Sequence, residues 1–179
     1  MLLTDKHIII GEFDLTQIIN GKEIMSPSPF TKHQKLITRL YDAIENYLET
    51  NKIGGETLLS PLDVIFEEHI NRVQPDLIYV AENNLDIIQD WIRGVPNLLV
   101  EVVSKSSFNL DTIDKKNIYE KYGVQEYWIV FPEFNSVEVY TLKNGKYELH
   151  VEVTNKGKMT SVIFDKFELD IEKLFYFSR

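Results

Sequence analysis

The sequence contains no cysteine, and its acidic residues outnumber its basic ones across 179 positions. Without thiolates, the chain cannot form a disulfide, a cysteine-ligated zinc site, an iron–sulfur cluster or a cysteine nucleophile. The 19 Lys and Arg against 28 Asp and Glu give a formal net charge of −9. This balance argues against an evenly basic surface for non-specific polyanion binding, so contact with phosphate must depend on a local basic patch or on bound cations.

Long apolar runs are also missing. No stretch approaches the roughly 18 consecutive apolar residues that a membrane span needs, and residues 1–11 do not combine a basic region with an apolar core as a signal peptide does. We therefore expect a cytoplasmic protein with no membrane contact. The sequence has no internal repeat or long Pro/Gly/Ser linker, and its length is sufficient for one domain over residues 1–179.

Helical periodicity is clearest over residues 31–50, where apolar positions recur at intervals of three and four. The patterns also predict a helix over 109–122, capped at Asn109 or Asp111, and a short helix over 12–19. Four segments rich in β-branched and aromatic residues are expected to be strands: 62–66, 76–80, 98–103 and 126–131. The third of these is almost continuously apolar, which is typical of a strand covered on both faces.

Apolar and polar residues alternate over 137–154 on both sides of Asn144-Gly145, a pair typical of a type I′ turn. This predicts a C-terminal antiparallel hairpin. The order of elements indicates an α/β (α+β) fold, a mixed β-sheet flanked by α-helices. Apolar residues in the hairpin and in the segment 167–177 further suggest a homodimer surface.

Each of three expected core strands carries an acid: Asp63, Asp76 and Glu101. Burying an unpaired carboxylate costs several kcal/mol, so such a residue usually faces a cation, a basic side chain or a metal. A single acid of this kind is as often a salt-bridged or strand-end residue. Three on probable neighbouring strands favour a functional site.

The helix after Glu101 strengthens this interpretation. Helical spacing places Asp111, Lys115 and Tyr119 on one face. If the aromatic part of that face packs on the sheet, Lys115 is carried towards the acids. The simpler alternative is a helix-stabilising ion pair between Asp111 and Lys115, four residues apart.

Five segments are similar to a known family: SPSPFTKHQKLITRL, LDVIF, VQPDLIYV, PNLLVEVVSKSS and DTIDKKNIYEKYGVQEYWIV. Together they resemble the Uma family of restriction endonucleases (DUF820-like), a branch of the PD-(D/E)XK nuclease superfamily. The last segment is the most specific. The resemblance extends from about Gly21 to Phe131 and implies a restriction-endonuclease-like fold with DNA as the substrate.

The resemblance also implies roles for particular residues. Asp76 matches the acid of the "PD" element and Glu101 the acid of the "(D/E)XK" element, so both are expected to ligate Mg²⁺ or Mn²⁺. Oxygen ligands suit these hard cations. The carbonyl of Val102 is expected to join them.

The lysine of the motif is displaced. The position two residues after the second acid is Val103, and the family counterpart of the lysine is Lys115 on the following helix. Lys105 is a second candidate, because it lies nearer the end of the strand.

Further candidates are less specific. His33 matches a family position and is expected to contact a phosphate or orient a metal-bound water, although a lone helix histidine is more often a surface residue. Asp63 is expected to support a second cation or bind a metal water, and Glu23 is a peripheral candidate. Trp91 and Trp128 are interpreted as core or interface residues rather than base-stacking platforms.

The hypothesis is a Mg²⁺-dependent endonuclease that hydrolyses DNA. Two alternatives stay open: a non-catalytic interaction or assembly module with the nuclease fold, and a nuclease for RNA or branched nucleic acid. A local basic rim would give weak, cation-dependent and salt-sensitive binding, and its expected members are Lys32, Lys35, Arg39, Lys105, Lys115 and Lys116.

Overall fold

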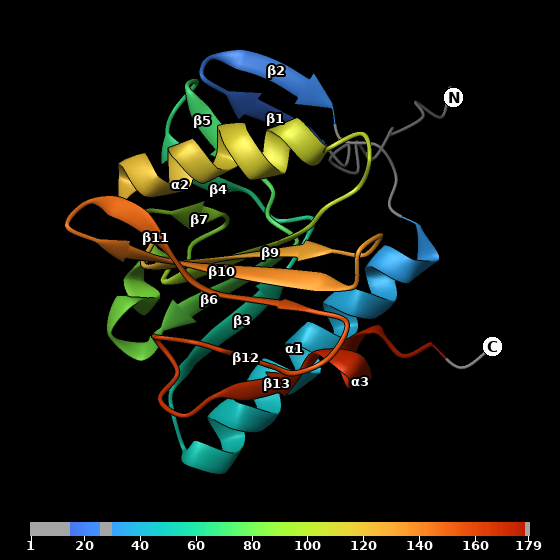
Figure 1. Ribbon diagram of the computed structural model, residues 1–179. Helices are drawn as coiled ribbons and strands as arrows, with labels where there is room; N and C mark the ends of the chain where they lie inside the picture. The colour runs from blue at the N-terminus through green and yellow to red at the C-terminus, as the bar shows by residue number, and fades with distance from the viewer. Residues whose placement is uncertain (1–14, 26–29, 178–179) are drawn as a thin grey trace, which may run out of the picture.

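The computed structural model describes residues 15–25 and 30–177, and a six-stranded mixed sheet lies at its centre (Figure 1). The strand order is β11-β10-β9-β8-β6-β3. The middle pair β8 and β9 is parallel, and the other neighbours are antiparallel. The bounds are β3 Gly55–Leu59, β6 Leu77–Ala81, β8 Leu98–Val102, β9 Glu126–Phe131, β10 Ser136–Lys143 and β11 Lys146–Thr154.

Helices cover both faces of this sheet, as the sequence predicts. Helix α1 (Thr31–Asn51) packs on one face through side chains at helical spacing, Leu36, Leu40 and Ile44 among them. The other face is covered by a helical stretch in which the π-helix η2 (Leu110–Lys115) continues directly into α2 (Lys116–Tyr122). Strand β8 is buried along its whole length because it contacts both layers.

A smaller sheet packs beside α2, with strand order β2-β1-β5-β4-β7 (Figure 1). Its strands are short: β1 Thr16–Ile19, β2 Lys22–Met25, β4 Val64–Glu67, β5 Asn71–Val73 and β7 Ile92–Arg93. The remaining elements are the 3-10 helix η1 (Glu82–Ile87), the strand pair β12 (Lys158–Thr160) and β13 (Glu168–Asp170), and α3 (Ile171–Phe175).

The predicted helix over 12–19 is wrong where it can be compared. Residues 16–19 form strand β1, and residues 12–14 lie outside the described part of the chain. Asn20 and Gly21 both have positive φ, 50° and 76°, which is the conformation of a type I′ hairpin turn. The pair therefore joins β1 to β2 instead of ending a helix.

The predicted hairpin over 137–154 is confirmed as β10 and β11. Its turn, Asn144-Gly145, has φ values of 51° and 78°, as a type I′ turn requires. One irregularity in the register falls between Val139 and Tyr140.

The segment 167–177 does not present the apolar surface expected of it. Phe167, Ile171, Leu174 and Phe175 are buried in the same core as the apolar face of α1. The sequence pattern shows an apolar face, but α1 and the sheet of the same chain cover it. The homodimer stays a prediction without the support of these side chains. No helix in the described part of the chain is long and apolar enough to cross a membrane.

Candidate active site

Two of the predicted acids face each other across neighbouring strands. Leu77 of β6 pairs with Val100 of the antiparallel β8, so Asp76 stands opposite Glu101, one residue further along. Side chains opposite each other in this way lie about 5 Å apart at Cβ. The Asp76 carboxylate also accepts a hydrogen bond from the backbone N–H of Val102 at 2.7 Å. The strand register therefore sets the position of both acids.

The helix above β8 brings a lysine to this pair. Lys115 Nζ lies 2.8 Å from Glu101 Oε1 and 3.4 Å from Asp111 Oδ1. The Tyr119 hydroxyl donates to the same Glu101 oxygen at 2.7 Å. The structure thus places Lys115 against the acids, whereas Lys105 is exposed in the turn that follows β8.

Asp111 is the residue of this cluster that the sequence interpretation missed. Its side chain is 3% exposed, so it is part of the buried cluster instead of a solvent-facing ion pair. The predicted side-chain cap at Asn109 is also absent. Both Asp111 and Lys115 lie in the π-helix, and π turns inside helices are frequent at functional sites. The shared face with Tyr119 was a signal for Asp111, but its burial depends on tertiary packing.

His33 approaches Asp76 from the first turn of α1. Its Nε2 lies 3.1 Å from Asp76 Oδ2. Burial alone would lower the pKa of His33, but the hydrogen bond and charge of Asp76 outweigh burial and raise it. The side chains of His33 and Asp76 are each 16% exposed, so the site opens to solvent on this side.

The buried part of the cluster holds two carboxyl groups against one lysine. Burial is the main cause that raises the pKa of Glu101, to about 8, and of Asp111, and Lys115 only partly offsets it. The same two acids raise the pKa of Lys115 even though its own burial acts in the opposite direction. An additional cation beside such carboxyl groups would favour their ionised form.

The donor set fits a hard divalent cation. Among residues 15–25 and 30–177, no three His, Asp or Glu side chains surround one point as a complete ligand set. Mg²⁺ does not need one, because it usually keeps several waters and takes one or two carboxylates. Asp76 and Glu101 supply those carboxylates.

Asp63 lies in a different group of side chains. Its Oδ1 accepts a hydrogen bond from Gln74 at 2.9 Å, and its Oδ2 is 3.7 Å from Arg72 Nε. Glu23 is exposed on β2. The structure therefore gathers His33, Asp76, Glu101 and Lys115 but does not add Asp63 or Glu23 to them through any contact it describes.

The two tryptophans lie in different environments. Trp128 is fully buried, and its indole N–H donates to Glu126. Trp91 is 45% exposed, with the guanidinium of Arg93 over its ring. Trp128 is thus a core residue, as predicted.

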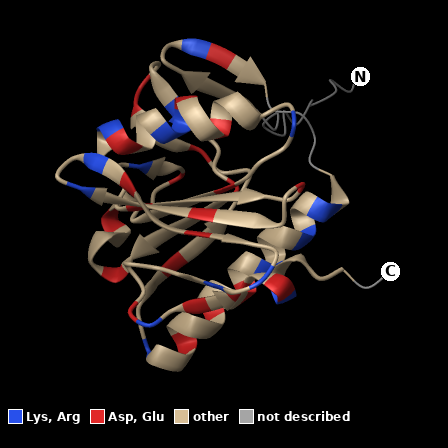
Figure 2. Ribbon diagram, viewed as in Figure 1, with Lys and Arg blue, Asp and Glu red and all other residues tan. Residues whose placement is uncertain are grey.

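Basic side chains gather near the open side on the first turns of α1, while acids follow along the same helix (Figure 2). Lys32, Lys35 and Arg39 surround the ring of Phe177. The predicted basic rim is wrong for Lys115, which is buried in the acid cluster. Lys116 is partly exposed and lies over the ring of Tyr140.

A mixed sheet flanked by helices, with facing acids at the end of two central strands, defines a nuclease fold of restriction-endonuclease type. A solved structure described as a putative nuclease belonging to DUF820, from Anabaena variabilis ATCC 29413, superposes with a TM-score of 0.72. It is 21% identical and covers 89% of each chain, a likeness that shows the fold.

The family model described as Uma2, "Putative restriction endonuclease", matches residues 13–172. The chain therefore belongs to the Uma2 family. A comparison with curated proteins found no match.

Proposed function

We propose that this protein is an endonuclease that hydrolyses DNA phosphodiester bonds with the help of Mg²⁺ or Mn²⁺. The observation that carries the proposal is that Lys115 contacts Glu101 and Asp111 while Asp76 stands opposite Glu101 on the neighbouring strand, next to a side that is open at His33. Membership of the family supports the reaction class.

Asp76 and Glu101 would hold the cation, together with the carbonyl of Val102. When bound, such an ion polarises a phosphoryl oxygen and lowers the pKa of a coordinated water. Lys115 contributes a positive charge whose position is fixed by Glu101 and Asp111, and it stabilises the negative charge that develops on the phosphoryl group.

His33 lies on the open side, and its Nε2, which pairs with Asp76 in the structure, would donate a hydrogen bond to a phosphate oxygen once a cation occupies the Asp76 carboxylate. Its place at the start of α1 also puts that phosphate near the basic first turns of the helix. Asp63 has no part in this proposal, because its carboxylate is engaged by Gln74.

A cleavage assay tests the reaction. Supercoiled plasmid and linear DNA are incubated with Mg²⁺, with Mn²⁺ and with EDTA, using the wild type and the variants Asp76→Asn and Glu101→Gln. We expect cation-dependent cutting that both variants lose, while Glu23→Gln on the exposed strand β2 cuts normally. The proposal fails if the wild type cuts no DNA form or if Asp76→Asn cuts at the wild-type rate.

A non-catalytic role of the same cluster is the second candidate. The observation that favours it is that Glu101 already has Lys115 and Tyr119 as partners and Asp76 has His33, as a purely structural cluster would. Calorimetric titration with Mg²⁺ and Mn²⁺ separates the two. Binding that disappears in Asp76→Asn supports the nuclease, and absence of binding in the wild type supports the structural role.

A further inference from the structure

Three phenylalanines are exposed around the open side of the candidate site. Phe30 is 79% exposed, Phe134 is 65% exposed and Phe108 is 45% exposed. They come from three segments that are distant in sequence: the residue before α1, the turn between β9 and β10, and the beginning of the helical stretch after β8.

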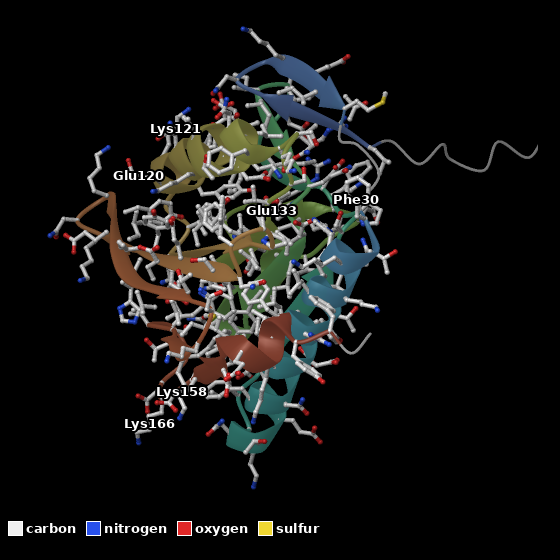
Figure 3. All side chains as sticks on the ribbon, turned by 45° about the vertical axis from the view of Figure 1, so that its right-hand side comes forward. Phe30, Glu120, Lys121, Glu133, Lys158 and Lys166 are labelled. Atoms are coloured by element: carbon white, nitrogen blue, oxygen red, sulfur yellow. The ribbon has the colours of Figure 1, made fainter. Side chains whose placement is uncertain are left out.

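Direct contacts bring these segments together. Phe30 precedes His33 by three residues, and Lys32 Nζ donates to the carbonyl of Pro132 at 2.6 Å, which joins the start of α1 to the turn that carries Phe134. Figure 3 shows Phe30 and Glu133 of this turn on the same side of the molecule.

Phe108 joins the same group from the other direction. Its ring lies 6.2 Å from that of Phe131, the last residue of β9. The N–H of Val103 donates to Val130 at 2.8 Å, so the segment leaving β8 runs beside the end of β9. The three rings therefore border the side on which His33 and Asp76 reach solvent.

Exposed rings at this place match the chemistry of a nucleobase. A phosphate gains nothing from a phenyl face, whereas every base can stack on one. Exposed cations accompany the rings, namely Lys32 and Lys35 on α1 and Lys105 after β8. Aromatic faces interleaved with cations are the usual surface for single-stranded nucleic acid. In a duplex the bases stack on each other and cannot reach such rings.

We propose that the site takes nucleic acid with unpaired nucleotides, and that Phe30, Phe108 and Phe134 stack on the bases next to the phosphodiester at His33 and Asp76. The inference rests on the proposed function for the position of that phosphodiester. It adds the substrate class: single strands, or branched and looped structures that contain them.

The test is fluorescence anisotropy with a labelled dT oligomer of about twelve nucleotides, an abasic oligomer of equal length and charge, and a duplex. Ca²⁺ is present, and a gel checks that each probe stays intact. We expect the wild type to bind the dT oligomer at least about a hundredfold more tightly than the abasic one, because more than one ring contributes. Phe30→Ala and Phe134→Ala should each lose about tenfold, and the duplex should bind more weakly than the single strand.

Further variants separate stacking from general apolarity. Phe30→Trp should retain the affinity for the dT oligomer, and Phe30→Leu, which keeps the apolar bulk but lacks the ring, should lose it. Trp91→Ala is the matched control, since it removes an exposed aromatic residue just before β7 of the small sheet. Its affinity for the oligomer should equal that of the wild type.

Three results from binding and light scattering would overturn the inference. The first is equal affinity for the dT and abasic oligomers, and the second is wild-type affinity in both Ala variants. The third is a dimer in light scattering that Phe30→Ala converts to monomers without a change in oligomer binding, which would make the rings a contact between copies. Plasmid cutting that the Phe variants leave intact would sink this inference but not the nuclease, whereas base-dependent binding without any cutting would do the reverse.

Discussion

The candidate site has a deep half and an open half, and the two halves differ in how their charges are satisfied. In the deep half, the side chains of Glu101 and Lys115 are each 3% exposed and contact each other directly. In the open half, His33 and Asp76 pair with each other but remain 16% exposed. The difference indicates that the deep half is fixed by folding, while the open half can exchange its present contacts for a cation and a phosphate.

Removing charge from the open half should give the largest effect, and on activity alone. Asp76→Asn keeps an oxygen that can accept the hydrogen bond from Val102 but loses a cation ligand. We expect the cleavage rate in Mg²⁺ to fall about a thousandfold, or about 4 kcal/mol of transition-state stabilisation, with unfolding changed by less than about 1 kcal/mol. Rates and urea unfolding curves measured on the same preparation check both parts. If Asp76→Asn lost as much unfolding free energy as transition-state stabilisation, the open half would not differ from the deep half.

Removing charge from the deep half should affect stability as well as activity. Lys115→Met leaves the buried carboxylates of Glu101 and Asp111 without their cation. Breaking a buried pair in this way costs about 3 kcal/mol of unfolding free energy. The control is Lys105→Met, an exposed lysine after the same strand, for which a change below about 0.5 kcal/mol is expected.

The pH dependence of the stability of Lys115→Met tests whether Lys115 lies beside Glu101 and Asp111. Lys115 lowers the pKa of Glu101 and of Asp111, so in its absence both pKa values lie further above those of the unfolded chain. Acids whose pKa is raised by folding bind more protons in the native state, and stability must then fall as pH rises from the unfolded towards the folded pKa. The free energy of unfolding of Lys115→Met should therefore be higher near pH 5 than near pH 8. If the free energy of unfolding depended on pH in the same way in the variant and the wild type, Lys115 would not lie close to Glu101 and Asp111.

Some residues of the candidate site could be predicted from the sequence and others could not. The strands that carry Asp76 and Glu101 were predictable because burial on both faces leaves a continuous apolar run that an acid visibly interrupts. Asp111 was not recognised as a site residue because an acid four residues before a lysine looks the same in a solvated helix as in a buried one. Only the packing of the π-helix on β8 distinguishes the two.

The other errors differ in origin. Three of residues 16–19 are β-branched, which locally favours a strand, and the strand forms by pairing with β2 and β5. The segment 167–177 was correctly seen as apolar on one face, but the identity of the covering surface is a long-range property. Local patterns thus predict which faces are apolar, while packing within the chain decides what covers them.

The Tyr119 hydroxyl in the deep half should contribute a smaller but measurable part of the free energy of unfolding. Tyr119→Phe removes the hydrogen bond to Glu101 and leaves the ring in the core. Above the raised pKa of Glu101, about 8, the acceptor is a carboxylate, and a bond to a charged acceptor is worth about 1.5 kcal/mol, so the free energy of unfolding near pH 9 should fall by roughly that amount. Tyr127→Phe, which loses a bond to the backbone carbonyl of Asp111, is the control for a neutral acceptor and should cost less. An equal cost would mean that Glu101 carries no more charge than a carbonyl.

The smallest expected effect concerns the rim of the open half. Glu133 is an exposed carboxylate in the turn that carries Phe134, where it repels an incoming phosphate. Glu133→Gln should raise the affinity for the dT oligomer about twofold to threefold at low salt, and the gain should vanish at about 1 M salt, where the Debye length is about 3 Å. Glu56→Gln on β3 is the matched control, because α1 spans about 30 Å and Glu56 lies beyond its other end. If Glu56→Gln gave the same gain, net charge would govern binding, and the distinction between a specific open side and the rest of the surface would fail.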